Sequence, residues 1–345
     1  MKVFYDINDV KDKWNLGPNN LFISGKFLRI FYDNHSKIKH LFFIDKNKRL
    51  YANIFKLNFV KAGNYLGANI LYSFLLRFLS FNVLYLSNSF ITNVLSFIID
   101  SKIDLDKLLN LIQKQYSLIV IPDFVYKKMK IKSDTFIKVE VEEEMVLSVR
   151  DNWHSMNDYI VDLKKKYRYK INKIIHNSND VIIRRLYKDD MEDYSVNIKE
   201  LFNQVIEKSR FNGPDFNTDS LHDFIDKGFV KLYGYFLHDN LVGFSSEIHD
   251  KDILYSYYVG FDRTLNKSHH LYSRMLIESI SNAILSKKNK IVFGRTANEY
   301  KSNFGATPIR SYVYIKITNK FLSIILNPAL QRINVSSWIQ RNPFK

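Results

Sequence analysis

The sequence predicts a mixed α/β fold in two related halves, each with a mostly antiparallel sheet flanked by helices. A strand–turn–strand pattern at 40–59, "HLFFIDKNKRLYANIFKLNF", occurs again at 231–250, "KLYGYFLHDNLVGFSSEIHD". Later in each half a helix runs into a further strand, at 105–124 and at 271–295. Hairpins combined with helix–strand units are typical of α/β and α+β domains.

The composition fits a soluble protein with a substantial core. The chain has 345 residues, 46% of them hydrophobic, and its mean hydropathy is −0.21. It has no cysteine, which excludes disulfides, thiolate nucleophiles and cysteine-ligated zinc. The first residues, "MKVFYDINDVKDKW", have no apolar core and do not form a secretory signal. We therefore expect a cytoplasmic protein.

One uncharged run, "FLSFNVLYLSNSFITNVLSFII" at 78–99, is long enough to cross a bilayer. It contains several asparagines and serines and follows Arg77 directly. We predict that it is a buried strand followed by a helix.

The net charge of +16 is spread along the chain. Such a field attracts phosphates, CoA, tRNA or an anionic membrane, so a peripheral contact with the inner membrane is one possibility. The abundance of lysine beside asparagine, isoleucine, phenylalanine and tyrosine is equally explained by compositional bias, so charge alone does not choose a partner.

The charged stretch "KVEVEEEMVLSVRDNW" at 138–153 separates the two halves. We predict an N-terminal domain at 1–138 and a C-terminal domain at 139–345. The second half begins with a basic amphipathic segment at 153–186, for which Ser155 or Asn157 is the predicted cap. Its apolar positions follow helical spacing: Tyr159, Ile160, Leu163, Tyr167, Ile171, Ile174 and Ile175.

The rest of the second half continues in a regular order. A helix is predicted at 190–209 and a short one in "SLHDFIDKG", followed by the hairpin and a third strand, "ILYSYYVGFD" at 253–262. An apolar stripe predicts a helix over 271–289, and "KIVFGR" at 290–295 reads as the next strand.

Two segments resemble a known family. "LKKKYRYKINKIIHNSNDVIIRRL" looks like the first helix of FemAB-like proteins, and "GFDRTLNKSHHLYSRMLIESISNAI" with "IVFGRTANEYKSNFGATP" looks like their last βαβ unit. The order of elements is that of GNAT acyltransferases. The resemblance implies two tandem GNAT-like halves, the first degenerate. It also implies transfer of an acyl group from an activated donor to an amine by direct attack in a ternary complex. No bound cofactor is implied; acyl-CoA or another activated donor is the co-substrate.

The turn before the 271–289 helix departs from the acetyl-CoA pattern, because "DRTLNKSHH" contains no glycine. Acetyl-CoA enzymes hold pyrophosphate on a glycine-rich turn at this position. FemAB-like members that use aminoacyl-tRNA lack the glycines as well. Arg263, Lys267 and His269 are the predicted anion-binding residues of this turn.

The tip of the 290–295 strand carries the main cluster of candidate site residues. We predict that Arg295 and Lys301 bind a phosphate or carboxylate of the donor. Thr296 is expected to orient the donor carbonyl, and Glu299 to contact the substrate. Alternatively, "GRTA" only caps the strand and Lys301 is solvated.

Three further residues are candidates for the reaction. Glu247 is a possible base, because burial inside a sheet disfavours a charged carboxylate; a solvent-facing position is the alternative. Tyr258 could donate a proton to the leaving group, or simply belong to the core. Arg168, in "RYKI", matches the FemAB-like "Arg-x-x-Ile" pattern and is a candidate substrate contact, or part of a solvated face.

We assign no metal, because His269 and His270 are neighbours that diverge on a helix and no third ligand is near in sequence. The expected acceptor is an amine on a small molecule, a lipid or a cell-envelope precursor. One alternative is transfer from aminoacyl-tRNA to an envelope precursor. Another is a non-catalytic module that binds nucleic acid or a membrane through the basic helix.

Overall fold

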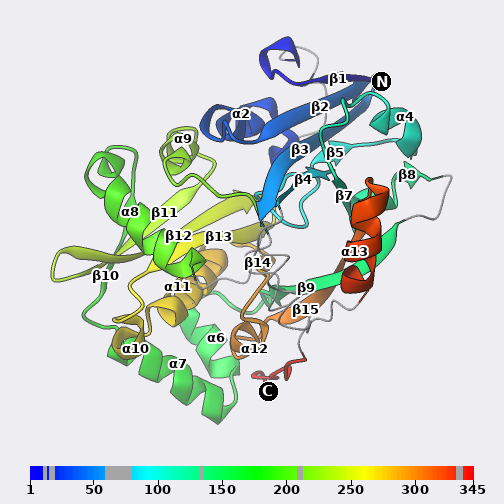
Figure 1. The fold of residues 1–345 in the computed structure, drawn as a ribbon. Coiled ribbons are helices and arrows are strands. Elements are labelled where there is room, and N and C mark those ends of the chain that lie inside the picture. Colours follow the sequence, from blue (N-terminus) through cyan, green and yellow to red (C-terminus); the bar gives the residue numbers. More distant parts are fainter. Residues whose placement is uncertain (11–13, 15–19, 59–79, 132–135, 208–212, 332–336) are drawn as a thin grey trace. The chain divides into compact units, whose positions relative to one another are not determined.

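The chain forms two compact units, both of mixed α/β architecture, as Figure 1 shows. The computed structural model describes residues 1–10, 14, 20–58, 80–131, 136–207, 213–331 and 337–345. Unit 1 comprises Met1–Val141, Arg210–Asn217 and Ser311–Ser336, and unit 2 comprises Glu142–Ser209, Thr218–Arg310 and Ser337–Lys345. The chain passes between them within β9 (Ile137–Ser148) and β15 (Thr307–Ile317). The predicted fold class is confirmed.

Unit 1 is a sheet with strand order β1-β2-β3-β4-β7-β15, in which β4 and β7 run parallel and the other pairs are antiparallel. Strand β5 also pairs with β3, and β6 pairs with β8 separately. The strands not yet placed are β1 (Lys2–Phe4), β2 (Lys39–Asp45), β3 (Lys48–Asn58), β4 (Ser80–Tyr85), β5 (Phe97–Ile98), β6 (Ile103–Asp104), β7 (Leu118–Pro122) and β8 (Met129–Lys130).

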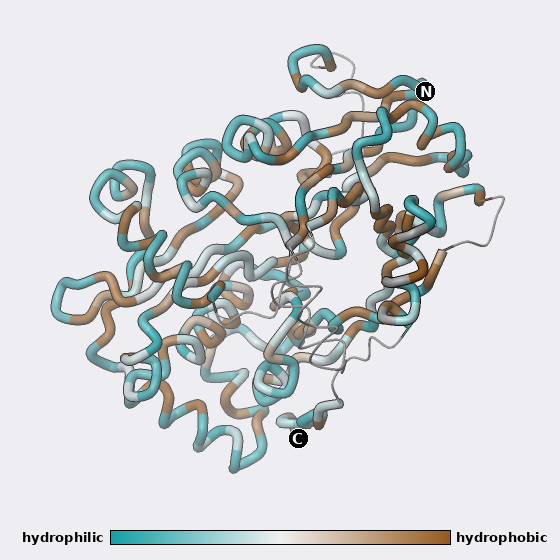
Figure 2. Tube along the Cα trace, in the orientation of Figure 1, coloured by the Kyte–Doolittle hydropathy of each residue, from teal (hydrophilic) through white to brown (hydrophobic). Residues whose placement is uncertain are grey.

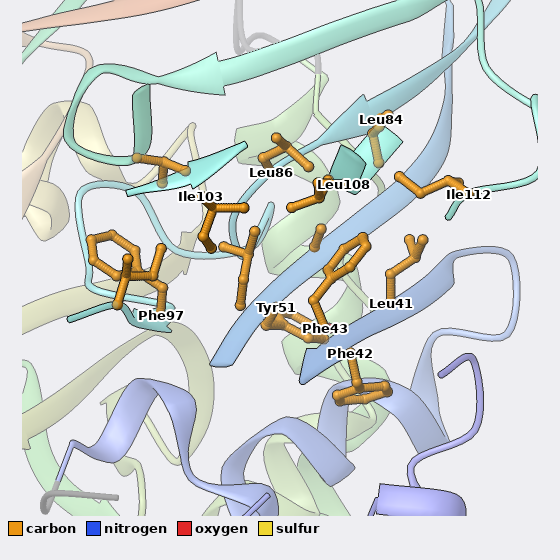
Figure 3. Packing of buried hydrophobic residues seen from close by; sticks show 14 of the residues in the cluster. Leu41, Phe42, Phe43, Tyr51, Leu84, Leu86, Phe97, Ile103, Leu108 and Ile112 are labelled. Carbon is orange, nitrogen blue, oxygen red and sulfur yellow. The ribbon is translucent and has the colours of Figure 1, made fainter. Parts of the chain in front are cut away.

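Unit 1 also contains helices, and its hydrophobic core packs against the sheet. They are η1 (Asn8–Val10), η2 (Leu21–Ile23), α2 (Gly25–Asn34), α4 (Leu105–Leu109), α5 (Asp123–Tyr126) and α13 (Lys320–Leu330). Figure 3 shows Leu41 and Phe43 of the first hairpin among buried residues of one cluster, which also includes Leu84 and Leu108. The helix predicted to begin at residue 105 is α4. It ends at Leu109 and is shorter than the 105–115 segment.

Unit 2 has the strand order β9-β14-β13-β12-β11-β10, and only β13 and β14 run parallel. Its remaining strands are β10 (Ile182–Leu186), β11 (Lys231–Leu237), β12 (Asn240–Asp250), β13 (Ile253–Phe261) and β14 (Lys290–Gly294). Its helices are α6 (Met156–Asp162), α7 (Lys165–Asn177), α8 (Asp190–Ile206), α9 (Ser220–Asp226), α10 (Asn266–His269), α11 (Leu271–Leu285) and α12 (Asn298–Ser302).

The second predicted hairpin is β11–β12, and it turns at His238 and Asp239. His238 and Asp239 have φ of 47° and 62°. Two successive positive φ values suit the tight turns that match the twist of paired strands. The third strand and the long helix after it are also confirmed, as β13 and α11.

The two units share one feature of pairing. In unit 1, β4 and β7 pair over three residues, from Val83↔Leu118 to Tyr85↔Val120. In unit 2, β13 and β14 pair over three residues, from Ile253↔Lys290 to Tyr255↔Val292. This agreement supports the prediction of two related halves.

Two expected helices need correction. The basic segment forms two helices, with a break at Leu163 and Lys164, both of which have extended ψ angles of 144° and 150°. Ser155 starts the first of them with a capping box to Asp158, as predicted. In Figure 2 hydrophilic and hydrophobic stretches alternate along α7, the pattern of a helix that buries one side.

The other correction concerns the uncharged run, of which residues 78–79 lie outside the described part. It forms β4, but no helix follows over 86–96. Asn88 accepts a hydrogen bond from the Phe90 N–H at 3.0 Å, and Ser96 accepts one from the Asn88 N–H at 3.3 Å. Such side-chain bonds to nearby backbone compete with a helix. In the described residues no helix is long and apolar enough to cross a membrane.

Helices α8 and α11 cover opposite faces of the unit 2 sheet. Val259 packs in a cluster with Met275 of α11. Its neighbour Gly260 faces α8, where a Cβ atom would lie 2.7 Å from the Phe202 nitrogen and 2.8 Å from the Leu201 carbonyl carbon. The α8 backbone therefore rests directly on this glycine.

Replacing Gly260 with alanine is expected to destabilise unit 2 by about 1–3 kcal/mol, because α8 must move away from the sheet. Chemical denaturation of the purified variant measures the loss. Val196→Ala, at an exposed position of α8, is the matched control and should change stability by less than about 0.5 kcal/mol. Equal stability of the two variants would contradict this packing.

Candidate active site

Strands β13 and β14 separate in the middle of unit 2. Their pairing ends at Tyr255 and Val292, although β13 continues to Phe261 and β14 to Gly294. We call the ends that do not pair with each other, Ser256–Phe261 and Phe293–Gly294, the fork. The two strands therefore diverge at this point. Because the strands are parallel, the fork is at their carboxyl ends, where α/β sheets bind ligands.

A β-bulge on each strand accounts for the fork. On β13, Tyr257 and Tyr258 together oppose the single residue Ser246 of β12, between the pairs Glu247↔Ser256 and Ser245↔Val259. On β14, Phe293 is the extra residue against β9. Bulges bend the strand that carries them and are frequent beside active sites. The Ser246 hydroxyl holds the first bulge by accepting from the Tyr258 N–H and donating to the Tyr258 carbonyl, both at 2.8 Å.

The tip of β14 has an unusual backbone. Gly294, Thr296 and Ala297 have φ of 72°, 70° and 51°. This region suits glycine, and a β-branched threonine is strained there. Strain of this kind persists only where surrounding contacts hold it, and it gathers at functional sites.

Lys301 is the residue that holds the tip. Its Nζ atom donates to the carbonyls of Phe293, Gly294 and Arg295 at 2.8, 3.1 and 2.8 Å, and its side chain is buried. An ammonium group has three N–H donors, so these carbonyls use all of them. Burial lowers the pKa of Lys301 to about 7, and the carboxylates of Glu142 and Glu144 oppose the decrease.

Arg295 and Thr296 lie at this same tip, Arg295 half-buried and Thr296 exposed. Glu299, in α12, forms an ion pair with Arg341. The structure therefore places these three predicted residues together with Lys301. Of the four, Lys301 faces the backbone of the strand instead of solvent.

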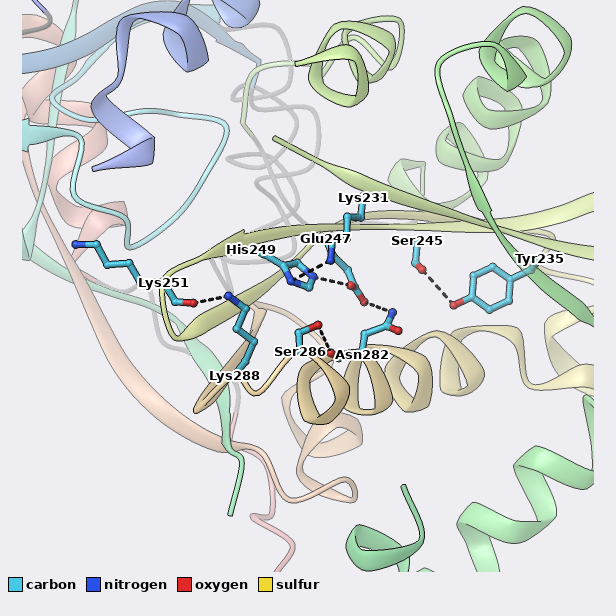
Figure 4. Close-up of polar contacts among 9 residues, drawn as sticks. All are labelled: Lys231, Tyr235, Ser245, Glu247, His249, Lys251, Asn282, Ser286 and Lys288. Carbon is cyan, nitrogen blue, oxygen red and sulfur yellow. Dashed lines mark hydrogen bonds and ion pairs between the residues drawn. The ribbon is translucent and has the colours of Figure 1, made fainter. Parts of the chain in front are cut away.

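Glu247 is in the interior, with 1% of its surface exposed. Figure 4 shows it between β12 and α11, where Oε2 contacts His249 Nε2 at 3.1 Å and Oε1 accepts from Asn282 Nδ2 at 3.1 Å. Lys231 Nζ lies 3.5 Å from the other nitrogen of His249. Glu247 is also paired with Ser256, the first residue of the fork on β13. Paired residues of an antiparallel ladder project on the same face, so Ser256 lies between Glu247 and β14.

Two tyrosines of β13 lie at the fork. Tyr258 is in the bulge, its ring meets Phe202 edge-on at 5.4 Å, and burial raises the pKa of its hydroxyl. Tyr255 is the last paired residue, and burial raises its pKa to about 12 with help from Asp250 and Glu144. Both hydroxyls therefore stay protonated near neutral pH. Tyr255 was missed in the sequence because one more aromatic in a tyrosine-rich strand carries no distinct signal.

The turn between β13 and α11 contains the short helix α10. Arg263 and Lys267 are exposed there, and the Arg263 N–H donates to Gln204 Oε1 at 3.1 Å. His269 lies 3.3 Å from an Asp180 carboxylate oxygen. Asn266 Oδ1 accepts the Tyr272 N–H at 2.9 Å, so one of the first amides of α11 is already bonded. In the described residues no group of three His, Cys, Asp or Glu side chains could hold a metal ion.

Arg168 has partners within the chain, since its guanidinium donates to the carbonyls of Val161 and Leu163 at 3.0 and 3.1 Å. Its role as a substrate contact stays a prediction. Lys170, also on α7, is better placed for a substrate contact. Its Nζ atom lies 5.3 Å from the centre of the ring of Tyr300, the residue that precedes Lys301. Burial lowers the pKa of Lys170, as do the nearby charges of Lys166 and Arg341. Lys170 was missed as a site residue because Tyr300 and Arg341, which lie beside it, are distant in sequence.

Comparison with known proteins finds a matching sequence family and similar folds. Residues 162–302 match the sequence model described as an acetyltransferase (GNAT) domain. L-PGS from Bacillus licheniformis has a similar fold, with a TM-score of 0.55 and 8% identity over 97% of this chain and 99% of that one. FemX aligns at a TM-score of 0.48, with 9% identity, over 94% of this chain and all of that one. None of the curated proteins matches.

Residues 162–302 therefore form a GNAT-like domain, as the sequence predicted. The similar fold over nearly the whole chain supports the resemblance to FemAB-like proteins, in which a GNAT domain follows an N-terminal half.

Proposed function

We propose that this chain is an N-acyltransferase that seats the activated carbonyl of a donor at the fork and lets an acceptor amine attack it directly. The observation that carries the proposal is the end of β13–β14 pairing at Tyr255 and Val292, with a bulge on each strand. In the described residues β14 does not pair with β13 beyond Tyr255. A backbone N–H group where the two strands diverge would donate to the oxyanion of a tetrahedral intermediate.

The reaction forms a C–N bond and breaks the ester or thioester bond of the donor. We assign the proton that leaves the amine to Glu247, reached through Ser256 or a water molecule, and the proton that the leaving group gains to Tyr258. Thr296 would orient the carbonyl. Holding donor and acceptor in reacting geometry supplies much of the rate enhancement, so covalent catalysis is not required.

Cations around the fork would bind the anionic part of the donor. Arg295 is at the tip, Lys170 lies beside Tyr300, and Arg263, Lys267 and His269 are in the β13–α11 turn. We add Lys170 to the predicted set because its half-buried ammonium is already crowded by like charges. An anion there would relieve that repulsion.

A second candidate donor is aminoacyl-tRNA, which the start of α11 favours. Asn266 already occupies the Tyr272 N–H that a pyrophosphate would use. Helix α7 meanwhile exposes Lys165, Lys166 and Lys173 around Tyr169, which is 70% exposed. Lysines around an aromatic suit phosphates and a stacked base. The acceptor would be an amine of a small molecule, a lipid or an envelope precursor, and the protein would work in the cytoplasm, at the inner membrane for a lipid.

Thermal shifts with acetyl-CoA, a long-chain acyl-CoA and charged tRNA test the proposal. A ligand that binds only the folded state stabilises it by about 2.7 kcal/mol at one hundred times its Kd. We expect one of these donors to raise the melting temperature, and Arg295→Ala and Lys170→Ala to reduce the shift. Lys199→Ala, at an exposed position of α8, is the control and should respond like the wild type. A protein that no donor stabilises, or that binds tRNA without transferring its acyl group, would contradict the enzyme and favour the non-catalytic module.

A further inference from the structure

Residues 338–345 form a strap across unit 2. The Lys164 N–H donates to the Pro343 carbonyl at 2.8 Å, and the Lys345 N–H donates to the Asp162 carbonyl at 3.1 Å, on either side of a bridge between Leu163 and Phe344. The strap thus pairs with the chain at the break between α6 and α7. This pairing explains why the two helices are separate.

Phe344 is the anchor of the strap. Its ring lies 5.4 Å from Trp153 and 5.9 Å from Tyr159, and the Arg150 guanidinium is 4.5 Å from its centre. It lies against Gly305 so closely that a Cβ atom there would be 2.1 Å from the ring. Gly305 also has a φ of 91°, which other residues rarely adopt.

The middle of the strap fastens α12. The Arg341 N–H donates to Ser302 Oγ at 3.1 Å, its guanidinium pairs with Glu299, and Gln340 Nε2 donates to the Ala306 carbonyl at 3.0 Å. A helix of five residues is not stable by itself. Contacts from outside must therefore hold α12 in place.

We propose that the 338–345 strap positions the fork, with Arg341 and Phe344 as its positioning residues. The strap holds α12, α12 carries Lys301, and Lys301 holds the last carbonyls of β14. The effect on catalysis rests on the proposed acyl transfer. The effect on the β14 tip does not.

Two variants test the strap, Arg341→Met and Phe344→Ala, with Phe344→Leu as the conservative replacement. Amide hydrogen exchange at Phe293–Thr296 is expected to accelerate at least tenfold in both, while the rest of the unit 2 sheet keeps its protection. Titration of Lys301, followed by NMR on lysine labelled at Cε, should shift toward higher pH as its buried site opens. Phe344→Leu should restore most of the exchange protection at Phe293–Thr296 and most of the wild-type titration of Lys301.

Lys345→Met is the matched control, because its Nζ atom donates to the Val161 carbonyl of α6 at 2.8 Å instead of to α12. It should exchange and titrate like the wild type. Unchanged exchange and titration in Arg341→Met and Phe344→Ala would overturn the proposal, as would equal changes in Lys345→Met. If acyl transfer is found, kcat should fall at least tenfold in the strap variants while KM for the donor changes less than threefold. Failure to find any transfer would count against the proposed function alone.

Discussion

Glu247→Gln is expected to lower the rate of acyl transfer by about 10²–10⁴-fold, the usual contribution of a general base. Glutamine keeps the shape of the side chain and can still accept a hydrogen bond from Asn282, but it cannot take up the proton of the amine. The fold should therefore survive. Single-turnover transfer with saturating donor measures the chemical step directly.

The matched control is Glu278→Gln. Glu278 is a carboxylate of α11 itself. It forms an ion pair with Arg274 at 2.8 Å, and burial raises its pKa. It lies on the helix and not on a strand of the fork. We expect Glu278→Gln to keep at least a third of the wild-type rate. Equal losses in the two variants would show that general disturbance under α11, and not the base, limits transfer.

The parts of the fold that the sequence predicts correctly are those encoded by neighbouring residues. Alternation defines β11, β12 and β13, the turn at His238 and Asp239 needs only local chemistry, and the stripe of α11 repeats at helical spacing. The resemblance to GNAT proteins rests on the same elements. Together they predict both strands that form the fork.

What the sequence does not reveal depends on distant contacts. The break at Leu163 is caused by pairing with Phe344, which is distant in sequence, at the other end of the second half. The partners of Lys301 are backbone carbonyls, so no side-chain pattern distinguishes it from a solvated lysine. Lys170 and Arg341 meet only in the folded chain. Lys301 holds the β14 tip, and Lys170 and Arg341 lie beside α12, where sequence reasoning found the polar residues but not their arrangement.

Lys301→Met should remove a specific pH dependence of stability. The pKa of Lys301 is about 7 in the folded protein and 10.5 ordinarily, so the unfolded state binds this proton more tightly. Stability therefore rises with pH between about 7 and 10.5, by at most about 5 kcal/mol, and this residue adds no slope below 7. Raised tyrosine pKa values oppose the trend only near and above pH 10. The lowered pKa values of Lys170 and Lys231 act alike in the wild type and in Lys301→Met, so the difference between their stabilities from pH 7 to 9.5 isolates the contribution of Lys301.

Methionine fills the same space but leaves the carbonyls of Phe293, Gly294 and Arg295 without a donor. The tip should then relax, and transfer should fall by about 10²-fold or more, since displacing a positioning group by 1 Å can cost that much. Lys290→Met, at the exposed start of the same strand, should keep both the pH slope and the rate. If Lys301→Met kept the wild-type slope, the lysine would not be buried in solution. If it lost the slope but kept the rate, the β14 tip would not position the reacting carbonyl.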